Sequence, residues 1–371
     1  MAQLRLNFDA MRWQQAAENW QAWWDGGLKR PLVMLEGYQP GWKAAHPDVP
    51  PKPNWTFTGR YPQDWPDDAV LDQYQQALEA GFFAGDSLPK FYVNLGPGAL
   101  AAFLGSEYQL FKDTGWFSPP KDENGLSWTE KPLDQIHLQF DPQNALWQRT
   151  YRLTERATQR WGGEVIIGMT DLGGNLDILA SLIGSERLAV EMLDHPEEID
   201  RLCAEIRAAW LLAYDRLDAL YSSFDKGSAC WASIWAPRRC YMLQSDFAYM
   251  ISPRLFKRFV MPDLQACCEA LDYPFYHLDG EGEIRHLDQL LTIEKLRGIQ
   301  WIPGAGAAPP EEWMPLLKRI RDGGKLCQLY ISAEGARKVV RELGGEGFAF
   351  DIDDEMTEEE AWRFAEELIH G

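Results

Sequence analysis

Residues 273–283 read YPFYHLDGEGE, and this stretch carries the pattern from which the fold is inferred. Side chains alternate along a strand, so Phe275, His277 and Asp279 share one face. The glycines that follow Asp279 allow Glu281 to come close to the same strand end. An imidazole and a carboxylate two residues apart can hold a divalent metal or share a proton. A histidine that is simply hydrogen-bonded to its neighbour would give the same pattern.

Strand and helix patterns alternate along the whole chain. The expected strands are 31–36, 81–95, 164–170, 227–236, 273–279, 299–303, 326–331 and 348–353, and nearly all precede a helical pattern. Strict alternation predicts a parallel sheet, and eight such units predict a closed (β/α)8 TIM barrel. Catalytic residues of such barrels lie at the C-terminal ends of the strands, so polar residues there are the candidates.

We expect one domain over residues 1–371, with three additions to the barrel. Residues 9–30 begin with an amphipathic helix that the glycines at 26 and 27 end. Residues 37–68 are rich in Pro and aromatic residues without periodicity, which predicts a long loop over the barrel mouth. Residues 105–141 carry short alternating runs and turn residues, which predicts an inserted hairpin.

Composition excludes several classes of function. The net charge of -20 argues against nucleic acid and against an anionic membrane surface as partners. The chain has no run of 18 apolar residues and no signal-peptide pattern at its start. We therefore expect a cytoplasmic protein that acts on a small molecule.

Other residues at expected strand ends are candidates for binding the substrate. Glu36 ends the first strand, and Asp171 and Asn175 lie in the turn after the third, where Asp171 could equally cap the next helix. Asp246, after the fourth strand, could reach the mouth or close its own loop. The remaining candidates are Trp231, Trp235 and Glu281.

The sequence resembles the uroporphyrinogen decarboxylase superfamily, which also contains corrinoid methyltransferases of methanogens and acetogens. The resemblance rests on VIIGMTDLGGNLDILASLIG (165–184), LDHPEEI (193–199), ISPRLFKRFVMP (251–262) and YHLDG (276–280). It covers most of the chain and is clearest from residue 164 onward. It implies the same barrel, with His277 preceding a functional loop.

The methyltransferase branch implies a metal site. Its members hold zinc with a His-x-Cys pair and a later Cys, whereas this chain has His277, Asp279 and, in its last strand, Asp351. Oxygen ligands favour a harder metal than thiolates do, so zinc or another divalent metal is expected. The methyl group would come from a corrinoid held by a partner protein.

The decarboxylase branch implies a different use of the mouth. Its aspartate after the second strand corresponds to Asp86, which with His277 would handle protons without any cofactor. The arginine-rich segment of that branch is replaced by Lys29 and Arg30 followed by Glu36, which suits a substrate with many carboxylates poorly.

Four functions remain open at this point. A methyltransferase with His277, Asp279 and Asp86 in catalytic roles comes first, and a decarboxylase of a porphyrinogen-like or other carboxylated substrate second. Carbohydrate chemistry would suit the tryptophans and carboxylates, and a ligand-binding barrel without catalysis is also possible. Relatives in the superfamily are often dimers, which makes a homodimer possible here.

Overall fold

The largest sheet of the computed structural model has seven strands in the order β2-β1-β13-β12-β11-β10-β9. The structure describes residues 4–47, 49–111 and 114–370. The strands of this sheet are β1 (Leu32–Tyr38), β2 (Gly81–Gly85), β9 (Cys240–Leu243), β10 (Tyr273–Asp279), β11 (Gly298–Ile302), β12 (Leu326–Ile331) and β13 (Phe348–Ile352). All neighbours in this sheet are parallel except β1 and β2.

Three further pairs of strands complete the set. They are β3 (Lys90–Tyr92) with β6 (Ile166–Gly168), β4 (Glu107–Leu110) with β5 (Gly115–Ser118), and β7 (Ser228–Ala229) with β8 (Trp235–Ala236). Only β3 and β6 are parallel. The backbone amide of Met169, just past β6, donates to Ala229 in β7 at 2.8 Å, and β7 packs against β9. The strands therefore follow one another around a barrel-like α/β fold, although their ladder is divided into separate sheets.

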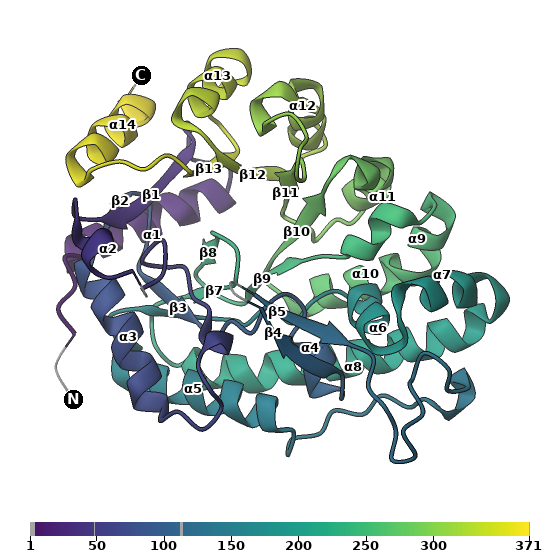
Figure 1. Cartoon of the computed structure of the whole chain (residues 1–371). Helices are drawn as coiled ribbons and strands as arrows, with labels where there is room; N and C mark the ends of the chain where they lie inside the picture. The colour runs from purple at the N-terminus through teal and green to yellow at the C-terminus, as the bar shows by residue number, and fades with distance from the viewer. Residues whose placement is uncertain (1–3, 48, 112–113, 371) are drawn as a thin grey trace.

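Most of the longer helices stand outside this ring of strands (Figure 1). The longer helices are α1 (Ala10–Trp24), α3 (Asp67–Ala80), α5 (Ala145–Trp161), α6 (Asn175–Ile183), α7 (Ser185–Asp194), α8 (Pro196–Tyr221), α10 (Met261–Ala270), α12 (Met314–Asp322), α13 (Ala333–Leu343) and α14 (Glu358–His370). The shorter ones are α2 (Trp42–Ala45), α4 (Leu100–Phe103), α9 (Pro253–Phe259), α11 (Leu287–Leu291), η1 (Thr58–Arg60), η2 (Leu133–Gln135), η3 (Asp246–Met250), η4 (Glu281–His286) and η5 (Pro310–Glu312).

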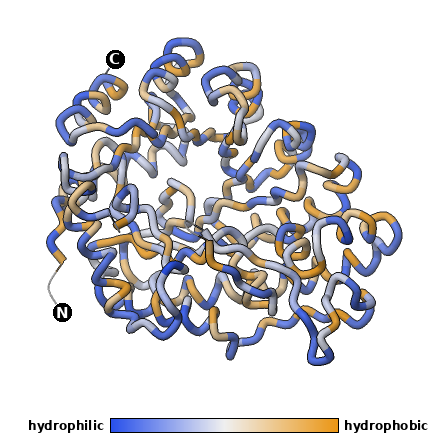
Figure 2. The backbone as a smooth tube through the Cα atoms, viewed as in Figure 1, coloured by the Kyte–Doolittle hydropathy of each residue, from blue (hydrophilic) through white to orange (hydrophobic). Residues whose placement is uncertain are grey.

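The outer helices are amphipathic, as Figure 2 shows by their mixed colouring. In α13 the buried residues Ala333, Ala336 and Val339 recur at every third position, which is the spacing of one helix face. None of the described helices combines the length and the apolar character that crossing a membrane requires.

Helix α1 closes one end of the barrel-like ring. The candidate functional residues lie at the opposite end. Asp9 caps it by accepting the amide of Arg12, and Gly26, with φ 68°, follows its last turn. The rings of Trp23 and Trp24 pack on Phe275 in β10, with centroids 6.1 and 5.8 Å apart. Phe275 and His277 share one face of β10. The side chains inside the barrel-like ring therefore extend from the tryptophans of α1 toward the opposite end of the ring.

Two expectations for the strands are corrected. Residues 227–236 were expected to form one strand next to β10. They form instead the short antiparallel pair β7–β8, and the strand that pairs with β10 is β9. Residues 81–95 contain two strands, and the first of them, β2, runs antiparallel to β1. Both segments are apolar, so a run of hydrophobic residues alone did not reveal where the chain turns. Residues 105–141 include the antiparallel pair β4–β5.

Candidate functional site

His277 lies in one layer of side chains with two buried glutamines. The register pairs His277 with Gln300 in β11, and Gln300 with Gln328 in β12. Gln300 donates through Nε2 to Oε1 of Gln328, so its own Oε1 accepts from Nδ1 of His277. This fixes the tautomer of His277 and leaves Nε2 with a free lone pair, as metal-binding and basic histidines require.

Asp246 and Asp279 lie beside this imidazole. Ligand atoms of Asp246, His277 and Asp279 all lie within 4.8 Å of one another. Asp279 is the last residue of β10, and the chain turns immediately after it through Gly280, whose φ of 81° favours glycine. One nitrogen and two carboxylates at this separation form a donor set that suits a divalent cation.

Asp177 at the start of α6 positions Asp246. Its carboxylate accepts the backbone amides of Asp246 at 3.0 Å and of Phe247 at 2.7 Å. The glycine turn before α6 makes this contact possible, because a Cβ on Gly174 would lie 2.1 Å from the carbonyl oxygen of Gln244. The segment after β9 and the helix after β6 are therefore locked together beside His277.

The carboxyl groups around this site are protonated more readily than usual. Burial, with the nearby Asp246, raises the pKa of Asp177 to about 8. Burial also raises the pKa of Asp171 to about 7, and that of Glu283 well above its usual range. The pKa of Asp246 is raised by burial and by Asp279, against the influence of His277. Such crowding of carboxyl groups favours a bound cation.

Trp231 forms a wall against the imidazole. Its ring meets that of His277 edge to face, with centroids 5.2 Å apart and planes at 78°. The loop that carries it is held by Lys90, whose Nζ donates to the carbonyls of Cys230 at 3.0 Å and Ala232 at 2.6 Å. A buried lysine in β3 thus supports the two residues on either side of Trp231.

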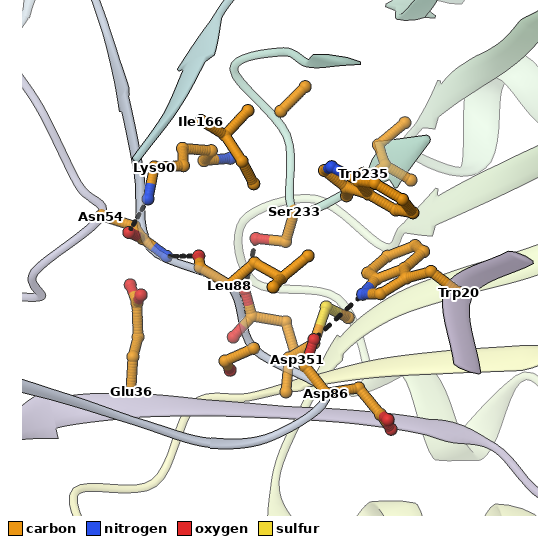
Figure 3. Close-up of a pocket in the computed structure, with 14 residues that line it drawn as sticks. Trp20, Glu36, Asn54, Asp86, Leu88, Lys90, Ile166, Ser233, Trp235 and Asp351 are labelled. Atoms are coloured by element: carbon orange, nitrogen blue, oxygen red, sulfur yellow. Dashed lines mark hydrogen bonds between the residues drawn. The ribbon is translucent and has the colours of Figure 1, made fainter. Parts of the chain in front are cut away.

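A cavity lies on the other side of this loop (Figure 3) and encloses about 420 Å³ including its opening. Figure 3 shows Glu36 and Asp351 directed into it from neighbouring strands. Asp351 accepts a hydrogen bond from Ser233 Oγ and lies 3.4 Å from Nζ of Lys52. Burial and the proximity of Asp351 raise the pKa of Glu36 to about 7. Lys90 therefore lines the same cavity as these carboxyl groups, and Lys52 contacts one of them, Asp351.

Two of the expected catalytic or metal residues are occupied elsewhere. Asp86 is 1% exposed and bound to Arg30 at 2.7 and 3.0 Å, and it also accepts the amide of Val33 at 2.9 Å. Its carboxylate points away from the cavity in Figure 3. Asp351 lies three strands from β10 in the sheet and contacts Lys52 and Ser233, so Asp246 takes its place beside His277 and Asp279.

The remaining candidates are spread over the mouth. Asp171 accepts the amide of Gly173 at 2.9 Å, which is a turn contact at the helix start. Asn175 donates to the carbonyl of Phe259 at 2.8 Å and is buried in the packing between helices. Trp235 lines the cavity of Figure 3, whereas Glu281 is exposed on η4.

Sequence reasoning missed several residues of this site. The signal for Gln300 and Gln328 was present, since each is a lone amide in an otherwise apolar strand. Lys90 likewise begins the short apolar strand β3. Asp177 and Lys52 gave no comparable signal, because only the folded chain brings them to the site.

Comparison with known proteins gives a likeness in fold. No protein-family model matches the sequence, and no curated protein shows significant sequence similarity to it. The solved structure of a methyltransferase from Methanosarcina mazei is similar with a TM-score of 0.59, covering 95% of this chain and 98% of that one. At 12% identity this similarity shows the fold.

Proposed function

We propose that this protein is a methyltransferase that binds a divalent metal through Asp246, His277 and Asp279. The observation that carries the proposal is the convergence of these three side chains within 4.8 Å, together with the orientation of His277 by Gln300. The similarity in fold to a methyltransferase supports the reaction class. The donor set of one nitrogen and two oxygens suits zinc or a harder divalent metal.

The residues of the site have separable tasks. Gln300 holds the imidazole with Nε2 available, and Asp177 holds the backbone on which Asp246 sits. Trp231 covers one side of the imidazole and limits the access of water. When bound, a divalent cation would supply Lewis-acid activation of the group that accepts or releases the methyl. We propose a corrinoid on a partner protein as the carrier of that methyl group.

Metal content tests this proposal directly. The purified protein is loaded with zinc and then dialysed. Elemental mass spectrometry should then find about one equivalent of zinc per chain. His277→Ala should lose it, whereas His46→Ala should keep it, because His46 is an exposed histidine on residues 37–68. Equal metal content in His277→Ala and the parent protein would refute the site. Loaded protein should then transfer the methyl group of methylcobalamin to a thiol acceptor.

Decarboxylation is a second candidate, and the cavity of Figure 3 favours it. Lys52 and Lys90 lie near Glu36 and Asp351 and could anchor a carboxylate, and the carboxyl of Glu36, with a pKa of about 7, could donate a proton to a carbanion. Asp86 cannot take that part while it is bound to Arg30. Activity that survives full removal of metal but is lost in Glu36→Gln would favour this reaction over methyl transfer.

A further inference from the structure

A second cavity lies beside Asp246, between the inserted hairpin and η3. It encloses about 870 Å³ including its opening. Trp116 and Phe117 of β5 form one wall, and Phe247 and Met250 of η3 form another. Trp116 is 58% exposed and Met250 62% exposed, so large apolar surfaces face this space without covering. Asp246 borders both this cavity and His277, so a molecule seated here reaches the site described above.

The polar residues of this cavity are all suited to a ligand that donates hydrogen bonds. Asp177 and Asp246 are both in its lining, and none of the described lining residues is lysine or arginine. An anionic ligand would therefore meet two carboxyl groups and no countercharge. Trp116 and Phe117 bring aromatic rings to this cavity, and a cation is attracted to the face of such a ring.

Gln244 supplies an independent sign of a ligand. It follows β9 directly, is 5% exposed and lines the cavity. Its Oε1 is buried and has no hydrogen-bond partner among the described residues. A buried carbonyl without a donor costs about 1–3 kcal/mol, and a ligand N–H at this position would remove that cost.

We propose that this cavity binds an organic ammonium ion with a small apolar body, beside the metal site proposed above. The N–H groups of the ammonium donate to Gln244 Oε1 and to the neighbouring carboxyl groups. Its apolar body packs between Trp116 and the residues of η3. The binding itself requires no metal, so this inference stands apart from the proposed function.

Three probes of one shape and different charge test the proposal. Benzylammonium, benzyl alcohol and benzoate are titrated into the full chain by calorimetry. Benzylammonium should bind about tenfold more tightly than benzyl alcohol, which corresponds to the energy of one charge-assisted contact, and benzoate should bind least. Equal affinity for the three probes, or a preference for benzoate, would overturn the proposal.

Variants of Gln244 locate the binding. Gln244→Met keeps the volume and removes the acceptor, so benzylammonium should bind about fivefold more weakly. Gln244→Glu adds a negative charge, so benzylammonium should bind more tightly relative to benzyl alcohol than it does in the parent protein. Such a gain in affinity cannot come from a variant that has merely unfolded. Gln14→Met, on the exposed side of α1, should leave all affinities unchanged. Unchanged binding in both Gln244 variants would place the probe elsewhere and refute the assignment.

One further variant separates this inference from the metal site. His277 does not line the cavity, so His277→Ala should keep the preference for benzylammonium. If the parent protein shows this preference but binds no metal, the proposed function is refuted and the ammonium site is supported. Metal bound normally without any preference among the probes would refute the ammonium site and leave the proposed function standing.

Discussion

Nδ1 of His277 donates to Oε1 of Gln300, which lies directly opposite on the neighbouring parallel strand. Gln300 is itself oriented by Gln328 on the next strand, so three strands in register set the tautomer of one imidazole. Residues that hold a metal-binding histidine in this way are known to affect metal affinity strongly, although they never touch the metal.

Replacing Gln300 should therefore weaken metal binding without removing a ligand. In Gln300→Leu the Nδ1 proton loses its acceptor, and we expect zinc affinity to fall about 10–100-fold. Competition with a chelator of known affinity measures this change. The exposed variant Gln14→Leu provides the control. An unchanged affinity in Gln300→Leu would show that the glutamine pair does not serve the imidazole.

Asp246 and Asp351 should differ in their effect on metal binding. Asp246 lies with His277 and Asp279, whereas Asp351 contacts Lys52 and Ser233. We expect Asp246→Asn to reduce metal affinity at least about tenfold and Asp351→Asn to leave it near the parent value. Measuring both by calorimetry decides between the ligand set proposed from the structure and the one inferred from sequence. The opposite ranking would restore Asp351 as a ligand.

Asp86 should prove to be a structural residue. Its carboxylate and Arg30 form a pair in which both side chains are largely buried, at 1% and 15% exposed. Asp86→Asn leaves the guanidinium without its countercharge, so the free energy of unfolding should fall by about 3–5 kcal/mol. Urea unfolding measures this loss. A variant of normal stability that has lost its activity would instead support the catalytic role expected from the sequence.

Lys90 should control the mobility of the loop that carries Trp231. Lys90→Met removes the donor from two buried carbonyls, those of Cys230 and Ala232. We expect faster amide hydrogen exchange over residues 229–235 and a stability loss of about 1–3 kcal/mol. Lys29→Met is the control, because Lys29 is 72% exposed and pairs with Glu346 at the surface. Exchange that stays slow in Lys90→Met would mean that the loop is held by its other contacts.

Asp263 should make stability depend on pH in a defined window. Burial in α10 raises its pKa to about 7, against the opposing effect of Arg207. An aspartate in an unfolded chain titrates near about 3.9, so between these values the folded protein keeps a proton that the unfolded chain has lost. The free energy of unfolding therefore decreases as pH rises through this window and is unaffected by this group above it.

Removing the carboxyl group should flatten that dependence. We compare the change in the free energy of unfolding between about pH 5 and about pH 8. This change should differ by about 1 kcal/mol or more between Asp263→Asn and the parent protein. Urea unfolding at both values gives the comparison. Parallel changes in the two proteins would show that Asp263 does not titrate within this window.

The sequence by itself determined the order of strands and helices and the common face of His277 and Asp279. Both follow from periodicities of two and 3.6 residues, which are local properties of the chain. These local patterns failed at residues 227–236, where an apolar run turns back on itself as β7–β8.

Only the tertiary structure decided which polar residues meet. The approach of Asp246 to His277 depends on Asp177, which comes from a helix much earlier in the chain. The register of three strands aligns Gln300 and Gln328 with the imidazole. Arg30 forms an ion pair with Asp86, which keeps this carboxylate away from the site. These contacts join residues whose separation in sequence carries no periodic signal, because strand register and loop path fix them only when the whole core packs.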